Sequence, residues 1–218
     1  MHTLKVLRTN YVTHNVKRFI VEKPDDFVYR PGQSAKVSIN KEGWEERKIS
    51  LTFTSLNEWP FLEFIVKIYK EHKGVTNEME SVVAGDELIL HEVFGTIEYK
   101  GPGIFIAGGT GITPFIAIFR ALFYSNNLRG VALLYSNHTQ EDIIIHEELF
   151  KMLGSAYMNV FTKQGVIGFI EKKIDRKFLI QTIGDFSHRF YVCGPKEFTE
   201  DITEALVSLG ADPQSLII

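Results

Sequence analysis

From residue 103 to the C-terminus, short apolar runs typical of strands alternate with longer runs typical of helices. The strand-like runs are residues 104–108, 130–137, 157–163 and 189–194, and the helix-like runs after them are residues 114–126, 141–153, 172–183 and 195–210. Alternation of this kind is the signature of a parallel sheet flanked by helices. In the last helix, Phe198, Ile202, Ala205, Leu206 and Leu209 recur at a spacing of three to four, which predicts that they face the core.

Residues 3–99 have a different pattern, with short β-rich runs separated by turn signals. The runs are residues 4–13, 16–23, 34–39, 48–55, 61–70, 87–93 and 95–99, and several alternate apolar and polar side chains. This spacing favours an antiparallel barrel or sandwich. One short helix fits residues 76–83, with Thr76 or Asn77 as its N-terminal cap.

The change of pattern falls at the short, glycine-rich segment of residues 99–103. We therefore predict two domains, a β-barrel of residues 1–99 and an α/β nucleotide-binding domain of residues 100–218. At 218 residues the chain is long enough for both to have a core.

Composition excludes several classes of function. The net charge of -3 provides no basic excess for nucleic acid, and no run of 18 uncharged apolar residues could enter a membrane. The N-terminus lacks the apolar core of a signal peptide, so we expect a cytoplasmic protein. Cys193 is the single cysteine, which excludes an intrachain disulfide and a self-contained cysteine-ligated iron–sulfur cluster. The seven histidines show no metal-binding spacing, so no metal site is predicted.

The segment IFIAGGTGITPF, residues 104–115, reads as a buried strand, a glycine turn and a helix start. No lysine follows the glycines, so it is not a P-loop, and Pro114 replaces the third glycine of the G-x-G-x-x-G dinucleotide fingerprint. Proline suits the first turn of a helix, because its missing N–H is no loss there. Free N–H groups at this helix start, with the hydroxyls of Thr110 and Thr113, predict a pyrophosphate site that also includes Gly109 and Gly111.

Four further motifs accompany this turn: YRPGQSAKV at residues 29–37, RKISLTFTS at 47–55, KGVTNEM at 73–79 and FYVCGPKEF at 190–198. Their order along nearly the whole chain resembles the ferredoxin–NADP reductase superfamily, which includes cytochrome b5 reductases. The resemblance implies a barrel that holds a flavin, usually FAD, and an α/β domain that binds NADH or NADPH.

In the barrel, RKIS resembles the family's Arg-x-Tyr-Ser/Thr motif. The resemblance implies that Arg47 pairs with the FAD pyrophosphate and that Ser50 lies near flavin N5, while Ile49 replaces the tyrosine that packs on the flavin. KGVTNEM is similar to a turn and helix start that contacts the same pyrophosphate through residues Gly74, Val75, Thr76 and Asn77. The PGQ segment is interpreted as a structural turn.

In the α/β domain, CGP resembles the family's signature beside the nicotinamide. Cys193 is the candidate for orienting the nicotinamide, and Gly194 and Pro195 shape the turn that follows. At the end of the second strand of this domain, Ser136 and Asn137 are predicted to contact the nucleotide. The segment 136–142 offers no Arg or Lys for a 2′-phosphate, which favours NADH over NADPH unless Arg120 or Lys163 reaches the site.

The leading hypothesis is an FAD-dependent NAD(P)H oxidoreductase that passes electrons to an external acceptor such as a flavodoxin, ferredoxin, haem protein or oxygenase component. Its cofactors carry the chemistry, which agrees with the lack of an evident catalytic triad or carboxylate pair. Ser50 and Cys193 are the candidate catalytic residues. Two alternatives remain open: a reductase of free flavin, which Ile49 makes credible, and a nucleotide- or flavin-binding module without turnover.

Overall fold

The computed structural model describes residues 1–71, 73–95, 97–163 and 172–218. By their contacts, these residues form two compact units that interleave in the sequence. The first comprises Met1–Glu98 and Thr113–Ala121, and the second comprises Tyr99–Ile112 and Leu122–Ile218. No helix among the described residues is both long and apolar enough to cross a bilayer.

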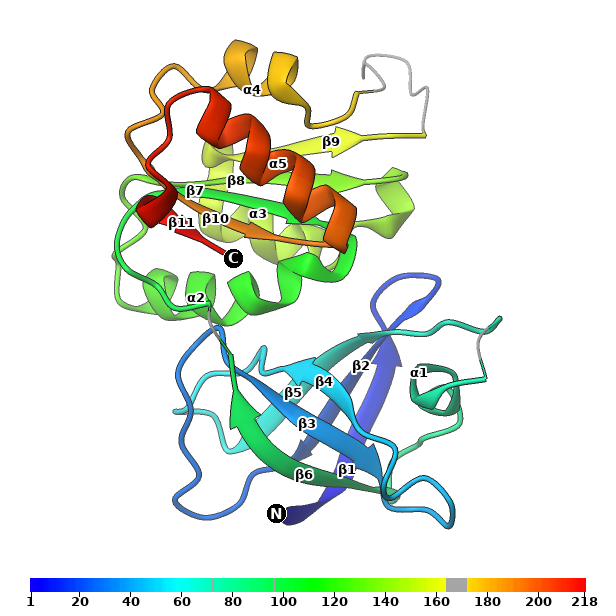
Figure 1. The fold of residues 1–218 in the computed structure, drawn as a ribbon. Helices are drawn as coiled ribbons and strands as arrows, with labels where there is room; N and C mark the ends of the chain where they lie inside the picture. The colour runs from blue at the N-terminus through cyan, green and yellow to red at the C-terminus, as the bar shows by residue number, and fades with distance from the viewer. Residues whose placement is uncertain (72, 96, 164–171) are drawn as a thin grey trace. The chain divides into compact units, whose positions relative to one another are not determined.

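The first unit is an antiparallel β-barrel. Its strands are β1 (His2–Tyr11), β2 (Val16–Glu22), β3 (Ser34–Ile39), β4 (Ile49–Thr52), β5 (Phe61–Lys67) and β6 (Glu87–Phe94), in the spatial order β4-β3-β6-β1-β2-β5 (Figure 1). An antiparallel bridge between Phe53, just after β4, and Phe64 of β5 joins the two edges of this sheet and closes it. The fold class predicted for this half of the chain is thereby confirmed.

The barrel core comes from the inward side chains of the alternating strands. Phe19, Phe53, Phe64, Leu62 and Leu88 are fully buried in it. The predicted turn before β3 is also structural, because the carbonyl oxygen of residue 33 accepts a hydrogen bond from the Phe53 amide at 3.1 Å. The strand predicted at residues 95–99 was wrong for the described part of that range, because β6 ends at Phe94 and residues 97–99 form no strand; Thr96 lies outside the described residues.

The short helix of the barrel unit differs from its prediction. Helix α1 spans only Val75–Glu78, and its N-cap is Gly74 in an extended conformation, without a side-chain cap. The prediction of Thr76 or Asn77 as the cap was therefore wrong. Val75 is buried, which draws the first helical residue into the core and leaves Thr76 and Asn77 within the first turn.

The second unit is built on an all-parallel sheet in the order β11-β10-β7-β8-β9. Its strands are β7 (Gly103–Gly108), β8 (Val131–Asn137), β9 (Tyr157–Phe161), β10 (Arg189–Cys193) and β11 (Leu216–Ile217). The parallel α/β fold predicted for this half is confirmed. The sequence analysis did not foresee β11, a two-residue strand that pairs with β10 at the sheet edge.

Helices cover both faces of this sheet (Figure 1). Helices α4 (Arg176–Thr182) and α5 (Lys196–Ser208) share a core with β7, β8 and β10. In that core, Ile202 and Leu206 are buried, and Phe198, Ala205 and Leu209 pack against them, as their spacing predicted. Helix α3 (His146–Leu153) starts later than its pattern suggested, because Ile145 takes a left-handed conformation with φ of 48°. Helix α2 (Thr113–Tyr124) follows the glycine turn.

Candidate nucleotide- and flavin-binding sites

The glycine turn lies at the carboxyl end of β7. Gly108 ends the strand, Gly109–Ile112 form one turn of 3-10 helix, and α2 begins at Thr113. Gly109 has φ of +54°, and a side chain there would meet open space. A left-handed glycine with open space beside it lets a ligand approach the backbone of the turn closely. The turn therefore lies where the sequence predicted a pyrophosphate site, with open space beside Gly109.

Gly111 brings this turn against the CGP segment. A Cβ built on Gly111 would lie 2.2 Å from the carbonyl oxygen of Cys193 and 2.6 Å from the amide nitrogen of Gly194. Both distances are far below van der Waals contact, so only glycine allows the two backbones to approach this closely. The structure thus brings together the glycine turn and the CGP segment, two of the motifs that the sequence singled out.

Phe198 of α5 packs over the glycines on either side of this contact. Cβ atoms built on Gly108 and Gly194 would lie 3.0 and 2.6 Å from the ring. The ring therefore occupies space that side chains at either position would need. Pro195 is the N-cap of α5, and its carbonyl oxygen accepts a hydrogen bond from the Thr199 amide at 3.0 Å.

Cys193 ends β10 as a free, half-buried thiol. Burial raises the pKa of the Cys193 thiol to about 11, and the backbone amide of Gly194 lowers it by a smaller amount. The side chain is therefore a neutral thiol at physiological pH. It can offer shape and a weak polar contact beside a ligand, but not an anionic charge.

The end of β8 carries two buried polar residues, Ser136 and Asn137. Neither amide atom of the Asn137 side chain makes a well-formed hydrogen bond among the described residues, although the buried Tyr135 hydroxyl lies near enough to interact with it. A buried amide with so little hydrogen bonding is costly, so this group calls for an explanation. The carbonyl oxygen of Asn137 accepts from the Thr162 amide at 2.9 Å, which joins the ends of β8 and β9.

The two cations that could bind a 2′-phosphate have different surroundings. Arg120 donates to Glu63 Oε1 at 2.7 Å and to the Thr54 carbonyl oxygen at 2.6 Å, and its guanidinium lies over the ring of Trp59. Arg120 is therefore buried within the barrel unit, with its guanidinium bonded there. Lys163 is exposed, and its amide donates to the carbonyl oxygen of His138 at 3.0 Å, which brings it beside the segment after β8.

In the barrel unit, the RKIS motif spans the loop before β4 and the start of that strand. Arg47 is exposed, and its guanidinium lies 4.8 Å from the centre of the Trp44 ring. Within the described residues its guanidinium makes no ion pair, so its donors can reach a phosphate. Ile49 is half-buried and packs against the barrel core. Ser50 is exposed and accepts a hydrogen bond from Lys36 at 2.8 Å.

Two lysines hold the turn and helix that contain the KGVTNEM motif. The ammonium of Lys17 in β2 donates to the carbonyl oxygens of Glu80 and Val82 at 2.9 and 2.7 Å, which fixes the chain after α1. Lys41, in the loop that also carries Arg47, pairs with Glu78 of α1 at 2.5 Å. The structure therefore ties the RKIS loop to α1. The amides of Val75 and Thr76 at the first turn have no acceptor within so short a helix.

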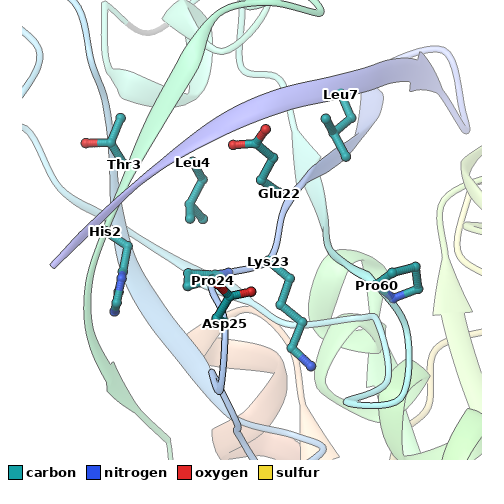
Figure 2. Close-up of a pocket in the computed structure, with 9 residues that line it drawn as sticks. All are labelled: His2, Thr3, Leu4, Leu7, Glu22, Lys23, Pro24, Asp25 and Pro60. Atoms are coloured by element: carbon teal, nitrogen blue, oxygen red, sulfur yellow. The ribbon is translucent and has the colours of Figure 1, made fainter.

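Sequence reasoning missed Lys36, Lys17 and Lys41, which contact these motifs from other strands and loops. A signal was present only for Lys36, which follows the PGQ segment by three residues. None of the predicted site residues lines the cavity of about 420 Å³ on the barrel surface (Figure 2). That cavity lies between the start of β1 and residues 22–25, and His2, Glu22 and Lys23 are among its lining residues.

Comparison with known proteins agrees with this arrangement. Residues 105–204 match the family described as the oxidoreductase NAD-binding domain. NADH-cytochrome b5 reductase 1 of Aspergillus terreus is 26% identical over 225 residues, which cover 91% of this chain and 74% of that protein. The glycine betaine monooxygenase reductase subunit of Chromohalobacter salexigens is 25% identical and matches 97% of this chain but only 61% of its own length.

Among solved structures, the FAD/NAD-binding domain of nitric oxide dioxygenase from Vibrio cholerae superposes with a TM-score of 0.85. It is 21% identical, and the match covers 99% of this chain and 96% of that one. At this identity the likeness establishes the fold. The family match identifies residues 105–204 as an oxidoreductase NAD-binding domain, and the whole chain has the fold of that FAD/NAD-binding domain.

Proposed function

We propose that the chain is an FAD-dependent NAD(P)H oxidoreductase that passes electrons to an external electron carrier. The observation that supports this most is the contact of Gly111 with Cys193 and Gly194, because it joins the pyrophosphate turn to the predicted nicotinamide contact. The oxidoreductase names of the relatives agree with it.

Each predicted residue then has a defined role. Arg47 and the first amides of α1 bind the FAD pyrophosphate, Ser50 donates to flavin N5, and Ile49 covers part of one flavin face. In the second unit, the nicotinamide nucleotide is bound by the turn residues Gly109, Thr110, Gly111, Thr113 and Pro114, by Ser136 and Asn137, and by Cys193, Gly194 and Pro195. A bound flavin supplies the conversion of two-electron to one-electron transfer, and the protein supplies position and exclusion of water.

The open space beside Gly109 and the weakly bonded amide of Asn137 fit a nucleotide. The turn offers N–H donors for phosphate, and Asn137 offers one donor group and one acceptor for a neighbouring polar group. Both residues lie at the carboxyl ends of adjacent parallel strands, β7 and β8, where open α/β sheets bind their ligands.

NADH is the proposed reductant. Arg120 is bonded to Glu63 in the barrel unit, and Thr139 and Asp142 bond to each other at 2.9 Å in the segment after β8. Lys163 lies beside this segment, because its amide donates to the carbonyl oxygen of His138. A tenfold or greater preference for NADPH in kcat/KM would overturn the assignment. If the Lys163→Met variant then lost that preference for NADPH, Lys163 would be the residue that binds the 2′-phosphate.

The proposed acceptor is a one-electron carrier, either a cytochrome b5-like haem protein or an oxygenase component. These two classes are suggested by two of the relatives, a cytochrome b5 reductase and a monooxygenase reductase subunit. Reduction of cytochrome b5 and of a purified oxygenase component by NADH, each measured with the same enzyme preparation, would separate them.

The visible spectrum of the purified protein, with and without added FAD, tests the main proposal. We expect flavin absorption that NADH bleaches in the absence of oxygen. Arg47→Ala should weaken FAD binding by about 10- to 100-fold, because hydrogen bonds to a charged group contribute about 1.5–3 kcal/mol. Arg8→Ala, which removes an exposed arginine of β1, is the matched control and should leave FAD affinity unchanged.

A free-flavin reductase is the second candidate, and the packing of Ile49 against the barrel core favours it. An aliphatic side chain that is partly occupied by the core offers a flavin less surface than a stacked aromatic ring. A colourless protein that oxidises NADH only when free flavin is added would support this candidate. A protein that neither binds flavin nor oxidises NADH would contradict both.

A further inference from the structure

Three neighbouring strands of the barrel place a lysine between Ser50 and an aromatic ring. The strands β4, β3 and β6 are adjacent, and they contribute Ser50, Lys36 and Phe94. Lys36 and Ser50 are direct cross-strand partners. The Lys36 ammonium donates to Ser50 Oγ at 2.8 Å and lies 5.1 Å from the centre of the Phe94 ring.

A break in the strand pairing accompanies this position. Along β3, the partners in β6 step from Val93, opposite Ala35, to Leu90, opposite Val37, so β6 carries one extra residue beside Lys36. A bulge of this kind redirects the side chains around it. The Phe94 ring then restrains the ammonium through a cation–π contact, which leaves the lysine with a defined direction across the sheet.

The chemistry of an ammonium group fixes the role of the serine hydroxyl. An ammonium has three donors and no acceptor, so Ser50 Oγ can only accept from Lys36. The hydroxyl proton of Ser50 must then point elsewhere, and Ser50 is exposed on this face of the barrel. A positive donor on the oxygen also makes that hydroxyl a stronger donor, because neighbouring hydrogen bonds polarise one another.

We propose that Lys36 is a positioning residue that holds Ser50 as a hydrogen-bond donor toward flavin N5 and thereby raises the reduction potential of the bound flavin. The inference rests on the proposed flavin-binding function. It extends that function because hydrogen bonds near N5 are among the means by which a protein tunes a flavin. Lys36 acts through Ser50 and is assigned no contact with the flavin itself.

The test is a spectroscopic redox titration of the protein saturated with FAD against a reference dye. Lys36→Met keeps the length of the side chain and removes the ammonium. We expect it to shift the flavin's oxidised-to-reduced equilibrium about tenfold toward the oxidised form, which is about 30 mV for a two-electron couple. Lys36→Arg retains a charged donor and should restore most of the shift.

Lys67→Met is the matched control. Lys67 lies on β5 with its ammonium 5.6 Å from the centre of the Tyr69 ring, so this variant removes one charge and one cation–π contact without touching Ser50. Its reduction potential should equal that of the wild type. An equal shift in both variants would show a general effect of net charge and would overturn the proposal.

A double-mutant cycle tests whether Lys36 acts through the serine. Ser50→Ala should produce a shift of similar size, and Lys36→Met added to Ser50→Ala should produce no further shift, since the path is already broken. Additive shifts would overturn the proposal. If the wild type binds FAD but Lys36→Met leaves its potential unchanged, the inference fails and the proposed function stands. If the wild type binds no FAD, both fail.

Discussion

In the α/β unit the glycine turn is held by backbone packed directly against backbone, whereas in the barrel unit the helix α1 is held by lysine side chains. Gly111 contacts the Cys193–Gly194 peptide, while Lys17 and Lys41 reach α1 from separate segments. A backbone contact has no adjustable partner, so one added carbon disrupts it. An ammonium contact can weaken gradually and depends on charge. The two units should therefore differ in how they respond to substitution, pH and salt.

The largest effect should follow from breaking the buried ion pair of the barrel unit. The side chains of Glu63 and Arg120 are each 3% exposed, so Arg120→Met leaves a buried carboxylate whose remaining cation among the described residues is the more distant Arg18, at 3.6 Å. We expect a loss of about 3–5 kcal/mol in the free energy of unfolding, measured by urea denaturation. Adding Glu63→Gln should recover part of it. A loss below about 1 kcal/mol would show that charge does not hold the barrel.

The next effect tests the backbone contact of the α/β unit. Gly111→Ala forces a Cβ to within 2.2 Å of the Cys193 carbonyl oxygen, and we expect it to cost about 3 kcal/mol of unfolding free energy. Gly184→Ala is the control, because a Cβ there meets open space, and it should change stability by less than about 0.5 kcal/mol. Equal stability of the two variants would show that close backbone packing does not hold the glycine turn of the α/β unit.

The reactivity of the Cys193 thiol tests whether this part of the α/β unit lacks a stabilising positive charge. Burial raises its pKa to about 11, so the thiolate that alkylating reagents require is scarce near pH 8. Iodoacetamide should modify the folded protein about 100-fold more slowly than an unfolded one, and the rate should increase as the pH approaches 11. A rate near that of free cysteine at pH 8 would show that a cation lowers the pKa of this thiol.

The raised pKa of Cys193 also makes the free energy of unfolding depend on pH. Because the folded state keeps the proton that the unfolded state releases first, the contribution of Cys193 is fully present at neutral pH and decreases as the pH rises toward 11. Cys193→Ala should lack this decrease. Denaturation midpoints measured from pH 8 to 10.5 would detect the difference between the two proteins.

The smallest effect concerns the surface ion pair between Lys41 and Glu78. The Lys41 side chain is 58% exposed, so Lys41→Met should cost about 0.5 kcal/mol of unfolding free energy at low salt and less at high salt. The hydrogen bond from Lys41 holds the pKa of Glu78 below its usual value, so this contribution is lost as the pH falls through that lowered pKa. An effect unchanged by salt would point to packing of the lysine stem.

The sequence predicted the fold class well because hydrophobic period and turn residues report local structure directly. It failed where tertiary contacts decide. Helix α1 begins at Val75 because that side chain is buried, and Leu216–Ile217 form a strand because they pair with β10. The partners of Arg120 lie 57 and 66 residues away, so no local pattern could assign it to the barrel.

In the candidate site, too, the motifs predicted residues but not the contacts between them. Motif spelling identified Gly111 and Cys193, but their contact depends on how β7 and β10 pair in the sheet. Ser50 came from a motif, whereas its bond with Lys36 depends on the register of β3 with β4. A single sequence carries little information about strand register, since only the alternation of side chains constrains it.

The pair formed by Glu63 and Arg120 also has an evolutionary consequence. Either residue alone would leave an unpaired charge in the buried interior and destabilise the protein. A pair of apolar residues at the two positions can give a protein as stable as the one with the ion pair. A lineage that loses one charge is therefore under pressure to lose the other. Among relatives of this chain we expect the two positions to change together, as two charges or as two apolar residues.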